Sequence, residues 1–161
     1  MSGLVAPKAV APTDETTDIS DKGVVVTTIP FYPDITLSDL RWAMRVNGTV
    51  TTARLKHAAT SAALYVNDLL KEWQAAQTAE TLGDVPSTPV NDETRHLFLY
   101  RQAVYSFTKS YLIENYRDID TTREGEKHAE ALSTQIDDLR RDGQNAVRDL
   151  MGLRRMVAEL A

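Results

Sequence analysis

The sequence predicts an all-α fold, a small bundle of about four helices with a long C-terminal helix and an extended N-terminal arm. Apolar residues recur at spacings of three and four in four separate stretches, which is the period of amphipathic helices. Stretches rich in Pro, Gly and small polar residues separate them. The 161 residues are enough for one domain with a modest core. We therefore expect an arm over residues 1–30 and one helical domain over residues 31–161.

Composition excludes several functional classes. The formal net charge is −5 at pH 7, which argues against nucleic-acid binding by bulk electrostatics. The chain has no cysteine, so disulfides, thiolate catalysis and cysteine-ligated zinc are ruled out. No apolar run reaches the roughly 18 residues that a membrane helix needs, and no secretory signal pattern opens the chain. We expect a soluble cytoplasmic protein, without a membrane partner.

Residues 1–30 differ in composition from the rest of the chain. They hold no aromatic residue, and prolines and small polar residues are frequent, so this segment cannot bury enough apolar surface to offset its ordering entropy. Within it, residues 23–29 (GVVVTTI) have the β-branched content of a short strand. No second strand is predicted nearby. We expect this strand to remain in the arm or to be lent to a neighbouring subunit.

Three helices are predicted between Pro33 and the last stretch of the chain. The first covers residues 36–46, with a threonine cap at its start and Asn-Gly after its end. The second runs over about residues 51–77, and its alanine-rich stripe permits the close approach of another helix. A Pro- and Gly-containing loop over residues 80–92 follows. The third helix, capped by Asn91 or Asp92 and ending near residue 116, is apolar around most of its circumference, which indicates the central helix.

The last helix is predicted over residues 122–160. A heptad seam of apolar or small residues runs from Ala129 to Leu160 in alternating steps of three and four. At 1.5 Å per residue this helix would be about 58 Å long, whereas a compact domain of this size is on the order of 30 Å across. One end should therefore project or lie against another chain. Gly143 and Gly152 are expected to mark bends or close contacts.

Charge is polarised along this last helix. Acidic residues dominate residues 118–138 and arginines dominate residues 140–161, an order that suits the helix dipole. Arg141, Arg148 and Arg155 are seven residues apart, opposite the apolar seam. They form either a solvated face or a stripe that meets an acidic partner.

Two acid–histidine groups raise the question of a metal site. His128 follows Glu124 by four residues, but two ligands do not make a site, and acidic residues are favoured at a helix start in any case. Glu93 and His96 form one E-x-x-H pair, whereas a di-iron bundle needs two such pairs and two further glutamates. No phosphate-binding loop or serine nucleophile motif is present. We expect no enzyme activity, no catalytic residue, no metal and no cofactor.

A local basic group surrounds Trp42. It consists of Arg41, Arg45, Arg54 and Lys56. These residues are suited to phosphate contacts, but a solvated helix face accounts for them more simply.

Several motifs follow one another in an order that resembles a known family. They include IPFYPDI at residues 29–35, VTTARL at 50–55, LGDVP at 82–86 and YRDID at 116–120. With this spacing the chain resembles the head completion proteins of contractile-tailed phages, the GpL family, over roughly residues 29–151. The resemblance implies a mostly helical head–tail connector, or adaptor, that forms a ring, usually twelve-fold, beneath the portal. Such a ring completes DNA-filled heads and offers a surface for the tail.

The resemblance also implies the partners and the location. Partners would be the portal ring, further copies in a homo-oligomeric ring and a tail completion or terminator protein, and packaged DNA would pass the channel without sequence-specific contact. The location would be the virion, at the neck between head and tail. The arm, with Phe31 and Tyr32 as aromatic anchors or as a staple onto the first helix, would lie across a neighbour. The last helix would pack on neighbours or reach the portal. The expected interface residues are Val24, Val25, Val26, Phe31, Tyr32, Arg140, Arg141, Arg148, Leu150, Leu153, Arg154, Arg155, Val157 and Leu160.

Two other classes remain open at this point. A small helical DNA-binding protein, such as a packaging accessory factor, would use the C-terminal arginines, although the net charge argues against it. A helical metalloenzyme would require a bound metal, which elemental analysis would detect.

Overall fold

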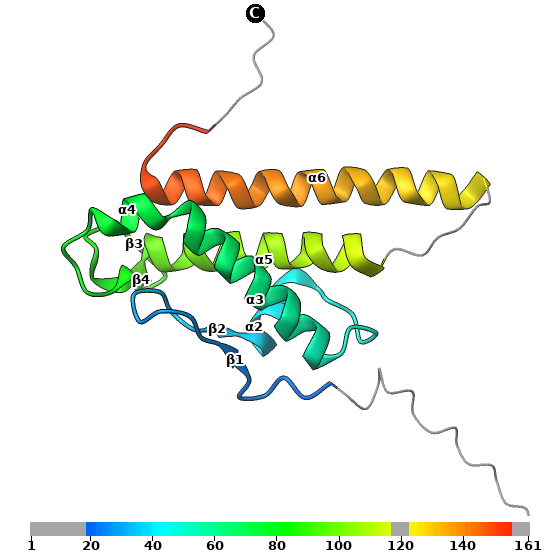
Figure 1. The fold of residues 1–161 in the computed structure, drawn as a ribbon, viewed down its shortest axis with the longest axis horizontal. Helices are drawn as coiled ribbons and strands as arrows, with labels where there is room; N and C mark the ends of the chain where they lie inside the picture. Colours follow the sequence, from blue (N-terminus) through cyan, green and yellow to red (C-terminus); the bar gives the residue numbers. More distant parts are fainter. Residues whose placement is uncertain (1–18, 117–122, 156–161) are drawn as a thin grey trace, which may run out of the picture.

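The computed structural model describes residues 19–116 and 123–155. Helices form most of the body, and two small antiparallel strand pairs accompany them (Figure 1). The all-α prediction is therefore correct for the body and incomplete for the strand pairs. In chain order the elements are β1 (Val25–Val26), β2 (Ile35–Thr36), α2 (Leu37–Met44), α3 (Thr52–Leu69), α4 (Lys71–Ala75), the 3-10 turn η1 (Leu82–Asp84), β3 (Pro89–Val90), β4 (Glu93–Thr94), α5 (Arg95–Tyr116) and α6 (Arg123–Met151).

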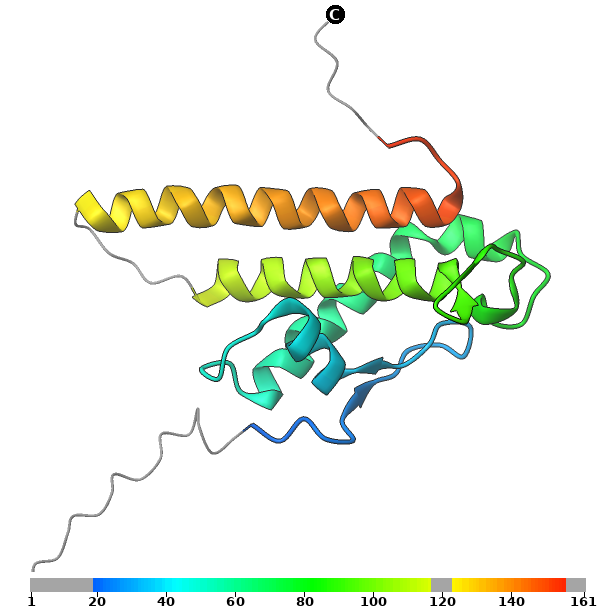
Figure 2. The ribbon, with the colours of Figure 1, turned by 180° about the vertical axis from the view of Figure 1, so that it is seen from behind.

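Helix α5 is the central element, as its apolar circumference predicts. Helix α6 runs along one side of it, and α2 lies on the other side, while α3 crosses it diagonally (Figures 1 and 2). Two buried hydroxyls of α5 bond to their own helix, whereas the buried Ser106 hydroxyl has no hydrogen-bond partner among the described residues. The Thr108 hydroxyl donates to the Val104 carbonyl at 2.6 Å, and the Ser110 hydroxyl donates to the Phe107 carbonyl at 2.7 Å. Such local bonds let a helix carry hydroxyls in its buried face.

Helix α3 begins where the sequence predicts. The Thr51 hydroxyl accepts a hydrogen bond from the Arg54 amide at 3.2 Å, which is an N-cap. The alanines of its stripe, from Ala58 to Ala63, are buried, so α3 approaches its neighbours closely. The predicted single helix to residue 77 is wrong, because the chain turns at buried Leu70 and α4 continues separately.

The first predicted helix, α2, begins and ends differently from its prediction. Thr36 belongs to strand β2, and its side chain forms no capping hydrogen bond with the first turn of α2. At the other end Arg45, with φ 54°, takes the left-handed position that the sequence suggested for Asn-Gly. The Val46 amide bonds to the Arg41 carbonyl at 3.0 Å and the Arg45 amide to the Trp42 carbonyl at 3.3 Å. This pair of bonds is a Schellman motif.

The β-branched segment of the arm does find a partner strand. Val25 pairs with Thr36 and Val26 with Ile35, so the expectation of a strand that is unpaired or lent to a neighbour is wrong for these residues. The pairing was invisible in sequence because each strand has only two residues. Residues 19–30 therefore pack on the body, and the expectation of an arm now concerns residues 1–18, which lie outside the described residues.

The loop expected over residues 80–92 contains the second strand pair. Asn91 and Asp92 have φ of 49° and 64°, and they connect β3 to β4 as a tight hairpin turn. They do not cap α5, which begins at Arg95 after β4.

Helix α6 is continuous over 29 residues, or about 43 Å at the usual rise, but it ends well before the predicted Leu160. Gly152 has φ 75°. The Leu153 amide bonds to the Arg148 carbonyl at 2.8 Å, and the Gly152 amide bonds to the Asp149 carbonyl at 3.1 Å. This Schellman motif stops the helix at Met151, and the seam residues Val157 and Leu160 lie outside the described residues.

The seam of α6 is largely covered by the chain itself. Ile136, Ala146 and Leu150 are buried, and α6 packs along α5 in antiparallel direction (Figure 1). The expectation of an apolar edge that the small body cannot cover is therefore wrong for this part of the helix. The N-terminal end of α6, yellow in the figures, extends past the end of α5 (Figures 1 and 2).

Candidate partner interfaces

The residues predicted as aromatic anchors of the arm belong to the core. Tyr32 stacks on Tyr100 with ring centroids 4.7 Å apart and planes at 7°, and Phe31 meets Tyr32 edge-on at 5.0 Å. The Phe31 carbonyl accepts the Leu82 amide at 2.8 Å. Burial raises the pKa of Tyr32 to about 12. In this fold the side chains of Phe31, Tyr32 and Val26 are buried and turn away from the surface that a partner would meet.

Val24 and Val25 are half-buried beside the same core. Between them and the anchors, Ile29 is the large apolar side chain that stays exposed. The described part of the arm therefore offers little apolar surface beyond this isoleucine.

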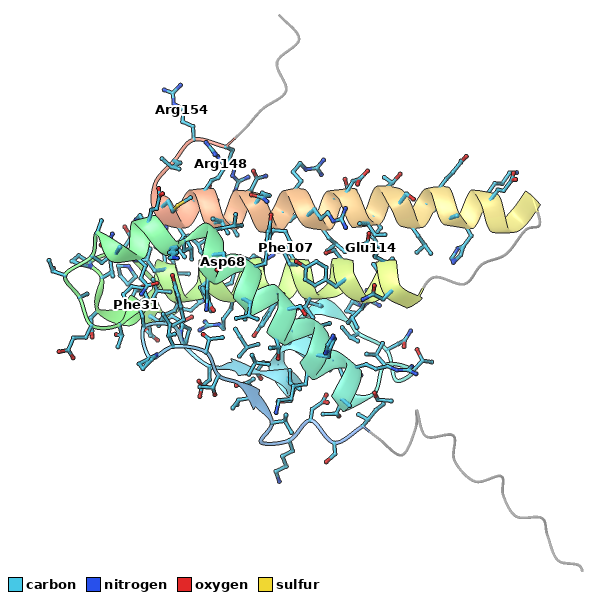
Figure 3. All side chains as sticks on the ribbon, in the orientation of Figure 1. Phe31, Asp68, Phe107, Glu114, Arg148 and Arg154 are labelled. Atoms are coloured by element: carbon cyan, nitrogen blue, oxygen red, sulfur yellow. The ribbon has the colours of Figure 1, made fainter. Side chains whose placement is uncertain are left out.

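The predicted arginine stripe is broken by the end of α6. Arg140 bonds to Glu114 of α5 at 2.6 Å (Figure 3 labels Glu114), and Arg141 bonds to Asp138 at 3.0 Å. The Arg148 guanidinium donates to the Arg154 carbonyl at 2.5 Å. These three arginines are thus engaged by their own chain. The bonds are exposed and contribute little stability individually.

Arg155 lies beyond the helix and folds back onto it. It holds Asp149 through two hydrogen bonds of 2.6 and 3.1 Å. The hydrogen bonds from Arg155 lower the pKa of Asp149. Arg155 therefore fixes the course of the chain after Gly152 instead of continuing a face of α6.

The two interface candidates that remain accessible at this end are Leu153 and Arg154. Leu153 is 49% exposed, whereas Leu150, one turn earlier, is buried in the core. The Arg154 side chain points away from the body (Figure 3). An exposed leucine beside an exposed arginine is a small amphipathic surface of the kind that a protein partner covers.

A second accessible surface surrounds Trp42, and we call it the Trp42 hollow. Its lining residues are Asp21, Ser38, Arg41, Trp42, Arg45 and Val46. Trp42 itself is 87% exposed. Tryptophan is enriched at the energetic centres of protein interfaces, and a tryptophan this exposed has no packing role in its own chain. Sequence reasoning had noted the basic group here but had not ranked it as an interface.

Charges in the Trp42 hollow are unequal. Arg41 forms an ion pair with the buried Asp21 carboxylate, which accepts a further bond from the Thr52 hydroxyl at 2.6 Å. Arg45 forms no ion pair with a residue in the described ranges. The Lys109 ammonium donates to the Met44 carbonyl at 2.7 Å, and burial together with the Arg45 charge lowers the pKa of this lysine. Among the charged lining residues, Arg41 is balanced by Asp21, so Arg45 carries the unbalanced positive charge of the hollow.

Glu93 and His96 of the E-x-x-H pair each contact another residue, and the side chain of Glu124 lies outside the described part of the chain. Glu93 forms an ion pair with Arg101, and His96 packs edge-on against Trp73 at 5.4 Å. His128 is exposed on α6. No three His, Asp or Glu residues in the described ranges are grouped as a metal would need. Within the same ranges, no helix has the length and apolar character to cross a membrane.

The fold and its surfaces define the class of protein. It is a small helical protein, and its accessible features in the described residues include Leu153 and Arg154 after α6 and the Trp42 hollow.

Comparison with known proteins identifies the family. The chain belongs to the phage head completion protein (GPL) family, whose profile matches residues 26–161. It is similar to the head completion/stabilization protein of Escherichia phage P2, with 32% identity over 171 aligned residues that cover 98% of each protein. No solved structure matches the chain significantly. The resemblance seen in the sequence is therefore confirmed, and the chain is a structural protein of the phage head.

Proposed function

We propose that this protein is the connector subunit between head and tail. Copies assemble as a ring, twelve-fold in our proposal, beneath the portal, complete and stabilise the DNA-filled head, and present a surface to the tail. Family membership supports the head role. The net charge of −5 per chain would give twelve copies about −60, which suits a channel through which DNA slides without adhering.

The C-terminal segment makes the portal contact in this proposal. The observation that carries it is the course of the chain after α6. The Schellman motif at Gly152 and the Arg155–Asp149 bonds lead the chain off the helix, and Leu153 and Arg154 are left exposed there. A segment held in one direction before binding loses less entropy when a partner covers it.

Co-sedimentation with the portal ring of the same phage tests this proposal. Full-length protein should sediment with the ring, and a chain cut after Gly152 should not. The cut must not be placed earlier in α6. A chain ending at Gly143, for example, would lack the core residues Ala146 and Leu150. Circular dichroism should show that the shortened chain keeps its helices.

Single substitutions make the test more specific. Leu153→Asp should weaken portal binding by at least about tenfold, because a carboxylate replaces an apolar contact. Arg154→Ala should weaken it less, and Lys22→Ala, an exposed cation near β1, serves as the matched control. Undiminished binding after the cut at Gly152 would reject the assignment of the portal contact to this segment.

A further inference from the structure

We propose that the Trp42 hollow binds the acidic face of α6 from a second copy of this chain. The acidic face is formed by Glu126, Glu130 and Asp137. The contact is the subunit-to-subunit interface of the ring, so this inference rests on the proposed function.

The three carboxylates lie on one line along the helix. At 100° per residue, Glu126, Glu130 and Asp137 fall within about 40° of one another. All three are exposed, and none forms an ion pair with a residue whose side chain the structure describes. Lys127, the lysine of this stretch, lies about 80° from their mean direction. Arg141 follows Asp137 by one turn on the same side of the helix and bonds to Asp138. The result is a line of three carboxylates over about three turns, none of them ion-paired with a described side chain.

This acidic face points away from its own body. The apolar seam, which packs on α5, lies about 130° around the helix from the three carboxylates. Arg140 of α6 pairs with Glu114 of α5, close to the end of α5 at Tyr116. Glu126 and Glu130 lie in the first turns of α6, toward the end of this helix that extends past α5 (Figure 1). A neighbouring molecule can therefore reach it.

The Trp42 hollow has the complementary chemistry. Trp42 supplies a large apolar surface, and Arg45 supplies positive charge beside it. Complementary charges orient two proteins, and a central tryptophan provides the binding energy. In the contact that we infer, Arg45 pairs with Glu130, and Trp42 covers the adjacent helix surface.

The occupant must come from another copy. Helix α2, which carries Trp42, and helix α6 lie on opposite sides of α5 (Figures 1 and 2), so a chain cannot fold its own acidic face into its own hollow. A contact between two different surfaces of the same protein is heterologous, and repeated around an axis it closes into a ring. A self-complementary contact would instead give a closed dimer.

Cysteine cross-linking tests this contact directly, because the chain has no cysteine of its own. Ser38→Cys places a thiol in the hollow, and Thr134→Cys places one on the flank of the acidic face. Mixed at equal concentration, with and without portal ring, these two variants should form a heterodimer with a short bis-maleimide. Gln135→Cys is the matched control, because this exposed position points about 160° away from the acidic face.

Charge reversal then identifies the ion pair. Arg45→Glu in the Ser38→Cys chain should reduce the cross-link about tenfold, and Glu130→Arg in the partner chain should restore it. Equal cross-linking at Gln135, no effect of Arg45→Glu, or no cross-link in either condition would overturn the inference. Portal co-sedimentation is measured on the same samples. If portal binding is retained but no cross-link forms, only the inferred subunit contact is rejected. If the unmutated chain does not bind the portal ring, the proposed function is rejected.

Discussion

Gly143 of α6 lies directly against the ring of Phe107 on α5. A Cβ at position 143 would come 2.6 Å from Cε2 of that ring, closer than real Cβ contacts come. The glycine therefore sets the distance between the two longest helices of the fold. Phe107 cannot easily yield, because it is buried and packs edge-on against Tyr65 at 5.0 Å.

Gly143→Ala should destabilise the protein. Alanine favours the helix by about 1 kcal/mol, but overpacking a core costs about 1–3 kcal/mol, and the rigid ring puts this case toward the upper end. We expect the free energy of unfolding to fall by about 1 kcal/mol or more, measured by urea denaturation. The double variant with Phe107→Leu should lose less than the sum of the single variants. A Gly143→Ala protein more stable than the parent would contradict the close contact.

Tyr32→Ala should destabilise the fold strongly. It removes a buried ring that stacks on Tyr100, and such truncations cost about 3–5 kcal/mol. Ile29→Ala, at an exposed position of the same segment, is the control and should cost less than about 1 kcal/mol. Thermal unfolding measures both. If Tyr32→Ala kept full stability but abolished assembly, Tyr32 would be an interface residue after all.

Asp21→Asn should loosen the described start of the chain. The carboxylate binds Arg41 and the Thr52 hydroxyl, and these hydrogen bonds lower its pKa even though burial opposes that shift. Loss of the charge leaves Arg41 without its carboxylate partner, with only the Asn47 carbonyl to accept from it at 3.0 Å, at a cost of about 2–4 kcal/mol. Limited proteolysis should then cleave near residues 19–24 faster. Asp34→Asn, at an exposed position, should leave the cleavage rate unchanged.

Stability should fall as the pH drops below about 6.5 because of His96. Burial lowers the pKa of this histidine, and the nearby Arg95 charge lowers it further, although a bond to the Val85 backbone opposes the shift. The folded state then binds fewer protons than the unfolded state, so stability is full above the unfolded pKa and is lost as the pH falls through it. Urea midpoints between pH 7.5 and 5.5 would show this slope.

His96→Gln should flatten that slope, whereas His128→Gln, at an exposed position of α6, should retain it. An equal slope in the parent and in His96→Gln would assign the pH dependence to another group. Carboxylates do not interfere in this range, since they titrate mostly below about pH 5.

The parts of the fold that the sequence could predict are those encoded by local pattern. The start of α3 near residue 51, the alanine stripe of this helix and the period of the seam before Gly152 each depend on residues close together in sequence. The pairing of Val25 with Thr36 could not be predicted, because two-residue strands leave no pattern. The burial of Tyr32 depends on Tyr100, a residue far away in sequence.

The end of α6 shows how a pattern can mislead. The seam continues in sequence to Leu160, but a glycine at the helix terminus with backbone bonds to Arg148 and Asp149 ends the helix at Met151. The prediction gave weight to periodicity and too little to the glycine. The interface prediction shared this error, because a stripe through Arg141, Arg148 and Arg155 requires an unbroken helix. The exposure of Trp42 could not be predicted from local pattern. Large aromatic side chains are usually buried, and the sequence does not show that this one is an exception.

The turn at Gly152 has a consequence for valency. Its backbone hydrogen bonds and the bonds from Arg155 to Asp149 set the direction in which the chain leaves the end of α6. In a symmetric assembly every subunit would then aim Leu153 and Arg154 at the same radius and height. Weak individual contacts arranged in this way bind a matching ring far more tightly than one contact binds alone. A single subunit could therefore have low affinity for the portal, while the assembled ring dissociates from it very slowly.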